Sequence, residues 1–252
     1  MNARIASCAF VTLLLAGTAS GTAFADTAEV PHQALQAPAR LVAAGFETTT
    51  RVTDTRFDAA GHVEQGYSLL RQGKQAQAVK LFDKVIADAD QRLSGDLRQR
   101  LCRGGASSGI AEPAGTVAVD SALCEAHFGK GYALIDLGRG DLAEAELRAA
   151  SQMAPGNAHF ANEYAELFKS RREWQQSYDL FARAWNVVDK STTGADARVA
   201  ARALRGMGFT KAAMGQYDEA RTLYEQSLQY DPKSEIAQAE LGNIARRKAI
   251  GS

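Results

Sequence analysis

The sequence predicts an all-α protein, built as an α-solenoid of stacked antiparallel helix pairs. From about residue 59 onward, apolar residues recur at helical spacing in stretches that are separated by glycines. Two of these stretches repeat the same residue types at the same offsets, which is the signature of a repeat architecture. The chain is 46% hydrophobic and 23% charged, values typical of a folded globular protein.

The two most similar stretches begin at Gly131 and Gly208. In each, a second glycine follows seven residues later, an alanine lies five residues after that glycine, and a proline lies seventeen residues after it. These residues are Gly138, Ala143 and Pro155 in one stretch, and Gly215, Ala220 and Pro232 in the other. Such fixed offsets predict one structural unit that occurs more than once.

These offsets resemble the tetratricopeptide repeat, a 34-residue helix pair. In that family a small residue lets the two helices approach, a glycine turns the chain, and a proline ends the second helix. In the third repeat Arg172 replaces the turn glycine. The resemblance implies four repeats and a capping C-terminal helix with a polar outer face, at 59–92, 124–157, 158–191, 201–234 and 235–252. Within the last segment we expect Ile236, Leu241 and Ile244 on one side of the helix.

The first 25 residues predict a secretory signal peptide. Arg4 precedes an apolar run over residues 5–17, and Ala23-Phe24-Ala25 forms a cleavage site before Asp26. The apolar run is shorter than the roughly 20 residues that span a bilayer, so no membrane insertion is expected after cleavage. We therefore expect a periplasmic or secreted protein, with a poorly structured lead-in over residues 26–58.

A segment over residues 93–123 separates the first two repeats. Leu93, Leu97 and Leu101 recur every four residues, which predicts a helix to about Cys102. The following glycine- and serine-rich stretch, residues 103–115, predicts a loop. Between the third and fourth repeats, Thr193 and Gly194 indicate a turn and the start of a new helix.

Cys102 and Cys124 are the only cysteines left after cleavage. In an oxidising compartment they are expected to form a disulfide, which would contribute about 3 kcal/mol by closing a loop. The alternative is a metal site that uses Cys102, Cys124 and His127. Structural zinc usually takes four ligands, and the sequence offers no good fourth.

Other chemical functions have weaker support. Residues 105–109 match G-x-S-x-G, but no strand precedes them, so the sequence disfavours a catalytic Ser107. Basic and acidic residues both number 29, which disfavours a nucleic-acid partner. We expect no enzyme activity and no cofactor, with an enzyme or metal-binding protein that uses residues 102–127 as the alternative.

The resemblance also implies a concave groove, which the first helix of each repeat lines and which binds a peptide or an amphipathic helix of another protein. Of the implied positions, Tyr67, Phe128 and Tyr132 are the best candidate anchors because aromatic side chains dominate binding energy at interfaces. Self-association through the first repeat is a further alternative. The implied groove positions are Val63, Tyr67, Leu70, Glu125, Phe128, Tyr132, Ile135, His159, Asn162, Glu166, Lys169, Arg202, Arg205 and Phe209.

Overall fold

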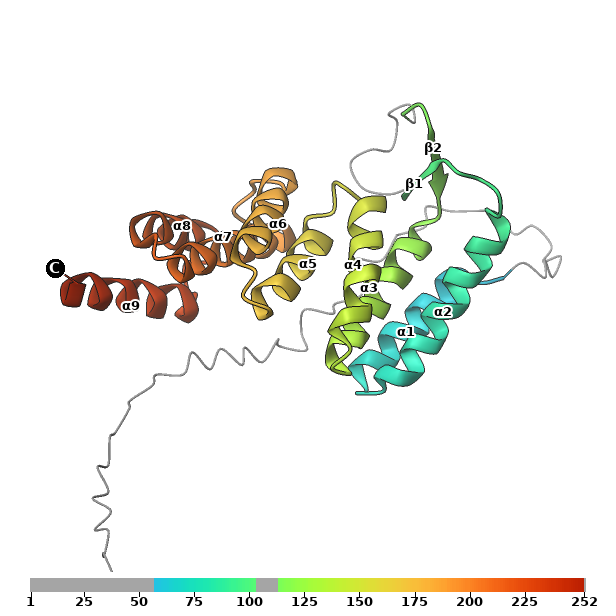
Figure 1. Ribbon diagram of the computed structural model, residues 1–252, viewed down its shortest axis with the longest axis horizontal. Helices are drawn as coiled ribbons and strands as arrows, with labels where there is room; N and C mark the ends of the chain where they lie inside the picture. The colour runs from blue at the N-terminus through green and yellow to red at the C-terminus, as the bar shows by residue number, and fades with distance from the viewer. Residues whose placement is uncertain (1–56, 103–112, 252) are drawn as a thin grey trace, which may run out of the picture. The chain divides into compact units, whose positions relative to one another are not determined.

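The computed structural model describes residues 57–102 and 113–251 (Figure 1). The signal peptide over residues 1–25, almost all of the lead-in and Ser107 lie outside the described residues. Within the described ranges the helices are α1 (Ala59–Arg71), α2 (Gln75–Arg92), α3 (Ser121–Asp136), α4 (Gly140–Met153), α5 (Ala158–Ser170), α6 (Trp174–Val187), α7 (Gly194–Ala213), α8 (Tyr217–Tyr230) and α9 (Glu235–Gly251). Two short strands, β1 (Gln99–Cys102) and β2 (Thr116–Val119), lie between α2 and α3.

The helices pack in successive pairs along the chain. α1 packs on α2, α3 on α4, α5 on α6 and α7 on α8, and each pair also contacts the next. The predicted all-α solenoid of stacked helix pairs is confirmed for this part of the chain (Figure 1). The helix expected near Thr193 is α7, for which Thr193 is the N-terminal cap.

Local signals explain where several helices begin. The side chain of Asp58 accepts a hydrogen bond from the Gly61 amide at the start of α1. Asp120 does the same for α3, and Asn157 for α5. Each oxygen satisfies an amide that lacks a partner within its helix, which stabilises a helix start by about 1 kcal/mol.

Small side chains lie where the paired helices meet. Gly131, Ala143, Gly208 and Ala220 are all buried. A Cβ atom added at Gly131 would lie 2.7 Å from Cγ of Leu147 on α4, closer than a real contact allows. The predicted role of these residues, close approach of neighbouring helices, is therefore confirmed.

The turns between paired helices use left-handed backbone. Gly73 and Gly138 each have φ of 71°, and Gly215 has φ of 80°. Arg172 occupies the same place between α5 and α6 with φ of 61°. Side chains with a Cβ atom rarely adopt this conformation, which costs roughly 1–2 kcal/mol relative to glycine.

Replacing Arg172 by glycine is therefore expected to raise the free energy of unfolding by about 1 kcal/mol, since glycine relieves the strain but adds some freedom to the unfolded chain. Urea denaturation of the purified protein measures the change. Gly215→Ala serves as the opposite case and should lower the free energy of unfolding by about 1 kcal/mol. A less stable Arg172→Gly variant would contradict this account of the turn.

The segment between the first two pairs differs from the prediction. The helix predicted to reach Cys102 ends at Arg92, because Gly95 turns the backbone with φ of 83°. Residues Gln99–Cys102 form β1 instead, which pairs in parallel with β2 in the register Gln99 to Thr116. Leu97 is 99% exposed, so its place in the four-residue pattern has no packing role.

A disulfide fastens β1 to the helices. Cys102, the last residue of β1, is bonded to the buried Cys124 of α3, with 6.4 Å between their Cα atoms. β1 also contacts α4. The strand is thus held at a fixed place against the second helix pair.

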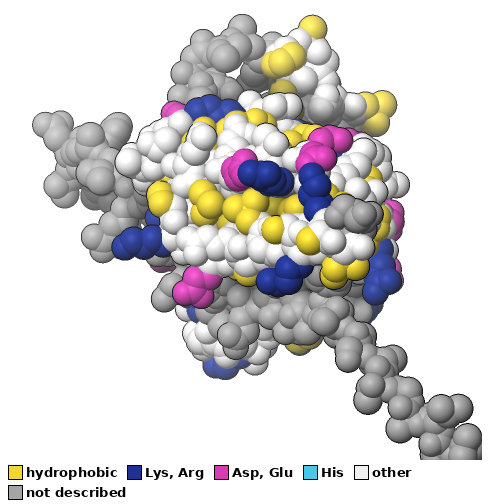
Figure 2. Space-filling view, turned by 90° about the vertical axis from the view of Figure 1, so that its left-hand side faces the viewer, with side chains coloured by type: hydrophobic (Ala, Val, Ile, Leu, Met, Phe, Trp, Pro, Cys, Tyr) yellow, Lys and Arg dark blue, Asp and Glu magenta, His cyan; other side chains and the backbone are white. Residues whose placement is uncertain are grey.

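The end of the chain exposes a mixed surface. On α9, Ala237 and Ile244 are buried against α8 with Leu241 partly buried, whereas Ile236 is 53% exposed, contrary to the prediction that it shares their side. Figure 2, viewed from the side on which Figure 1 draws α8 and α9, shows a band of hydrophobic side chains between charged ones. A polar outer face was expected for α9, but its exposed side chains include Ile236 and Ile250 beside the charged ones. Within the described ranges, no helix has both the length and the apolar character needed to cross a membrane.

Candidate functional site

The implied groove positions lie on α1, α3, α5 and α7, the first helices of the four pairs. α3 contacts α1 and α5, and α5 contacts α7, so these first helices are neighbours. The structure thus brings their side chains onto adjoining elements. How far each side chain remains accessible differs between the two ends.

At the α1 end, the implied groove residues belong to the core. Val63, Tyr67, Leu70 and Phe128 are buried. Phe128 is only 2% exposed and stacks on Phe160 of α5, with 4.5 Å between the ring centroids. The prediction that Tyr67 and Phe128 act as anchors is wrong, because the Tyr67 ring packs on Phe82 of α2 and is covered, and the Phe128 ring is covered by α5.

Tyr67 also has a polar role in this core. Its hydroxyl donates to Oε2 of Glu125 on α3 at 2.6 Å. Burial, with the Glu125 charge as a smaller cause, raises the pKa of Tyr67 well above its usual value, and burial also raises the pKa of Glu125. The pair therefore links α1 to α3 and does not face a partner.

Asn162 is likewise an internal residue. It is completely buried on α5, and its side-chain amide donates to the Val199 carbonyl oxygen of α7 at 3.1 Å. Its predicted place in the groove is wrong, because the contact between α5 and α7 covers it.

A charged cluster joins α5 and α7 at the centre of the stack. The guanidinium of Arg202 donates to both carboxylate oxygens of Glu163, with the Nη2 to Oε2 bond at 3.1 Å. A second carboxylate, Glu166, lies 3.7 Å from Arg202 and 2.6 Å from the amine of Lys169. Burial alone would raise the pKa of Glu163, but Arg202 outweighs that effect and lowers it.

The remaining side chains around this cluster are partly accessible. Tyr132 is half-buried, and burial together with the charges of Asp136 and Glu163 raises its pKa to about 12. Ile135, one turn further along α3, is 37% exposed. Phe209 of α7 lies between Trp174, at a centroid distance of 6.0 Å, and the amine of Lys169, 5.1 Å from the ring centre.

Two further residues complete this surface. His159 lies 5.0 Å from Phe128 between ring centroids, and burial lowers its pKa. Arg205 donates to Asp231 at 3.0 Å. We call the partly accessible set the first-helix face; it consists of Tyr132, Ile135, His159, Glu166, Lys169, Arg202, Arg205 and Phe209.

The sequence matches family models at two places along the chain. A tetratricopeptide repeat model matches residues 157–233, and a second one matches residues 63–91. With the stacked helix pairs, these matches decide the family. The chain belongs to the tetratricopeptide repeat family.

Solved structures of similar fold agree with this assignment. PilF of Pseudomonas aeruginosa is 15% identical, with a TM-score of 0.55 over 76% of this chain and 69% of that one. MamA is 16% identical, with a TM-score of 0.52 over 73% of this chain and 84% of that one. At such identities the likeness concerns the fold alone. No curated protein sequence matches the chain.

The groove positions implied by the tetratricopeptide repeat family missed two residues that the structure places at the site. Glu163 forms the ion pair with Arg202, yet it lies one residue after an implied groove position. Trp174 belongs to a second helix but packs against Phe209. Glu163 is a carboxylate among the buried residues of α5. A buried carboxylate is expected to have a charged partner, so this setting could have pointed to the ion pair.

The metal site proposed as an alternative does not form in this repeat protein. Cys102 and Cys124 share a disulfide, so neither sulfur is available as a thiolate ligand. Nδ1 of His127 hydrogen-bonds to Oε2 of Glu146 at 2.6 Å. Across residues 57–102 and 113–251, no group of three or more His, Cys, Asp or Glu side chains is placed to hold a metal ion.

Proposed function

We propose that this tetratricopeptide repeat protein is a non-enzymatic scaffold of the cell envelope, which binds a peptide or an amphipathic helix of a partner protein on its first-helix face. Membership of the repeat family supports a protein–protein interaction scaffold.

The first-helix face combines partly exposed apolar side chains with charged ones, and this composition is the main support for the proposal. Tyr132, Ile135 and Phe209 are partly exposed on first helices, and the Lys169 amine, which pairs with Glu166, lies 5.1 Å from the centre of the Phe209 ring. Such a combination suits a partner with an apolar stripe and a polar edge, which is what an amphipathic helix presents. Aromatic side chains at such a surface supply most of the binding energy.

Two features support a place in the cell envelope. The sequence begins with the pattern of a secretory signal peptide, which ends at Ala25. The Cys102–Cys124 disulfide is the kind of bond that persists outside the reducing cytosol. Both features suit a protein that works after export.

A photo-crosslinking residue at position 135 tests the proposal in intact cells. Ile135 is 37% exposed on α3, so the change should leave folding intact. We expect illumination to capture a partner protein, identified by mass spectrometry. A purified segment of that partner should then bind the unaltered protein and lose about tenfold in affinity when Phe209 is replaced by alanine.

The matched control places the same crosslinker at position 142. Leu142 on α4 is 42% exposed, so it resembles Ile135 in type and exposure but belongs to a second helix. Capture of one partner equally from both positions would contradict a role for the first-helix face. Capture of a second copy of this chain would replace the proposal by self-association.

A further inference from the structure

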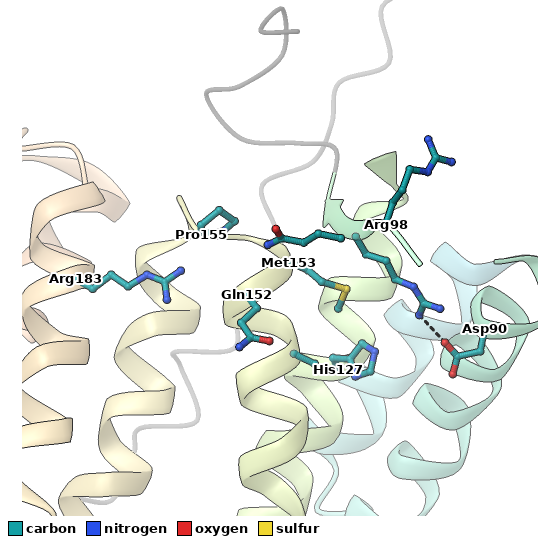
Figure 3. Close-up of a pocket in the computed structure, with 10 residues that line it drawn as sticks. Asp90, Arg98, His127, Gln152, Met153, Pro155 and Arg183 are labelled. Atoms are coloured by element: carbon teal, nitrogen blue, oxygen red, sulfur yellow. Dashed lines mark hydrogen bonds and ion pairs between the residues drawn. The ribbon is translucent and has the colours of Figure 1, made fainter. Parts of the chain in front are cut away.

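A second candidate site lies outside the first-helix face, where β1 meets the second helices of the repeats. A cleft of about 710 Å³ opens there, lined by residues of α2, β1, α4 and α6 and by His127 of α3. Figure 3 shows the side chains that line it, with Arg183 reaching from α6 toward Gln152 and Pro155. Because β1 is tied to α3 by the disulfide, its wall of the cleft is held in place.

The walls of this cleft carry an excess of positive charge. The described residues that line it include three arginines, Arg98, Arg100 and Arg183, and one carboxylate, that of Asp90. Arg100 pairs with Asp90 at 2.5 Å, as the dashed line in Figure 3 marks. Arg183 donates to a neutral acceptor, the Ser151 carbonyl oxygen, at 2.9 Å, so its charge is not matched by that contact.

This excess is local, because the whole chain carries 29 basic and 29 acidic residues. Figure 3 shows that Arg98 points away from Gln152 and Arg183, and Arg98 is already paired with Asp96 at 2.6 Å. The charge that faces the cleft is therefore mainly that of Arg183, with the Arg100 guanidinium on the opposite wall.

The space between these two arginines is not uniformly charged. Met153 and Pro155 supply apolar surface, and the side-chain amides of Gln99 and Gln152 supply hydrogen-bonding groups. A small inorganic anion would use only one wall. An extended polypeptide matches all three kinds of group. Its backbone carbonyls accept hydrogen bonds from the side-chain amides, the aliphatic parts of its side chains pack on the apolar surface, and its carboxylates pair with guanidinium groups.

We infer that this cleft binds an acidic segment of a partner polypeptide, with a carboxylate on Arg183 and the chain running between α6 and β1. Guanidinium suits this task because its planar donors match a carboxylate in pairs. The site is separate from the first-helix face, so it adds a second contact surface to the proposed scaffold.

The test uses the purified full-length protein with its disulfide intact and a fluorescently labelled peptide of alternating Glu and Ala residues. A second peptide, with Gln in place of every Glu, has nearly the same shape without the charge. We expect the Glu peptide to bind at least about tenfold more tightly than the Gln peptide in fluorescence anisotropy titrations, and its affinity to fall as salt is added.

Gln152 allows a matched pair of charge changes in the cleft. Its side chain is exposed on α4, so neither change should disturb folding. We expect Gln152→Glu to weaken binding of the Glu peptide about fivefold and Gln152→Lys to strengthen it to a similar degree. Arg183→Gln should weaken binding about tenfold, whereas Arg221→Gln, an arginine loss on the exposed surface of α8, should leave it unchanged.

Several results would overturn the inference. These are no binding of the Glu peptide, equal binding of the two peptides, and a Gln152→Glu variant that binds the Glu peptide as well as the unaltered protein does. Displacement of the peptide by inorganic phosphate, with no displacement by chloride at the same ionic strength, would assign the cleft to phosphate. None of these outcomes bears on the crosslinking at position 135, so the two proposals fail independently.

Discussion

Replacing Phe82 by alanine is expected to lower the free energy of unfolding by about 3–5 kcal/mol. The Phe82 ring is fully buried on α2 and lies against two glycines, Gly66 of α1 and Gly129 of α3. A Cβ atom added at either glycine would lie 2.5 Å from the ring, so both helices approach the ring as closely as the backbone allows. Its removal leaves a cavity between three helices that rigid backbones cannot close.

Urea denaturation followed by circular dichroism measures this loss. Leu142→Ala is the control, because that side chain is 42% exposed and its truncation should change the free energy by less than about 0.5 kcal/mol. A loss at Phe82 no greater than that of the control would contradict the central place given to this ring. A combined Gly129→Ala and Phe82→Leu variant should be more stable than Phe82→Ala, since leucine fills part of the cavity and leaves room for the added methyl group.

The second large effect is expected at the ion pair between α5 and α7. Replacing Glu163 by alanine should lower the free energy of unfolding by about 3 kcal/mol, because it leaves the Arg202 guanidinium without its main partner in a largely buried place. Replacing both residues by methionine should restore most of the loss, since the pair then leaves no unmatched charge. Glu225→Ala, which breaks an exposed pair with Arg221, should cost less than about 0.5 kcal/mol.

The pH dependence provides an independent check on this pair. Because the folded protein lowers the pKa of Glu163 below its ordinary value of 4.5, the pair stabilises the fold fully above pH 4.5. That contribution is lost as the pH falls through the lowered pKa and the carboxylate takes up a proton. The stability difference between the unaltered protein and Glu163→Ala should therefore shrink in acid, and a constant difference would contradict the assigned role.

The features of the fold that the sequence predicted correctly are those set within one repeat. The spacing of Gly131 to Ala143 predicted a close contact between paired helices, because both residues act on neighbouring turns of a local hairpin. The strand at Gln99–Cys102 was not predictable in this way. Its partner lies at Thr116–Val119, so its formation depends on a distant pairing that the local leucine spacing does not record.

In the candidate site too, features set within one repeat were predictable from the sequence, and features set by contacts between repeats were not. The family positions indicated which side chains lie on first helices, but not which of them a neighbouring repeat covers. Tyr67 and Phe128 are enclosed because α1 and α5 both pack on α3, whereas Ile135 lies near the end of α3 and stays partly exposed. The cleft beside β1 depends on the strand itself and therefore had no counterpart in the sequence pattern.

The contacts between successive helix pairs determine which part of this protein unfolds first. In the part of the chain that the structure describes, each pair packs mainly on its immediate neighbours, and α9 packs on α8. The disulfide between Cys102 and Cys124 ties β1 to α3, toward the other end of the stack. Because stability in such an array is a sum of neighbour terms, we expect the last helices to fray while the helices around the disulfide keep their structure.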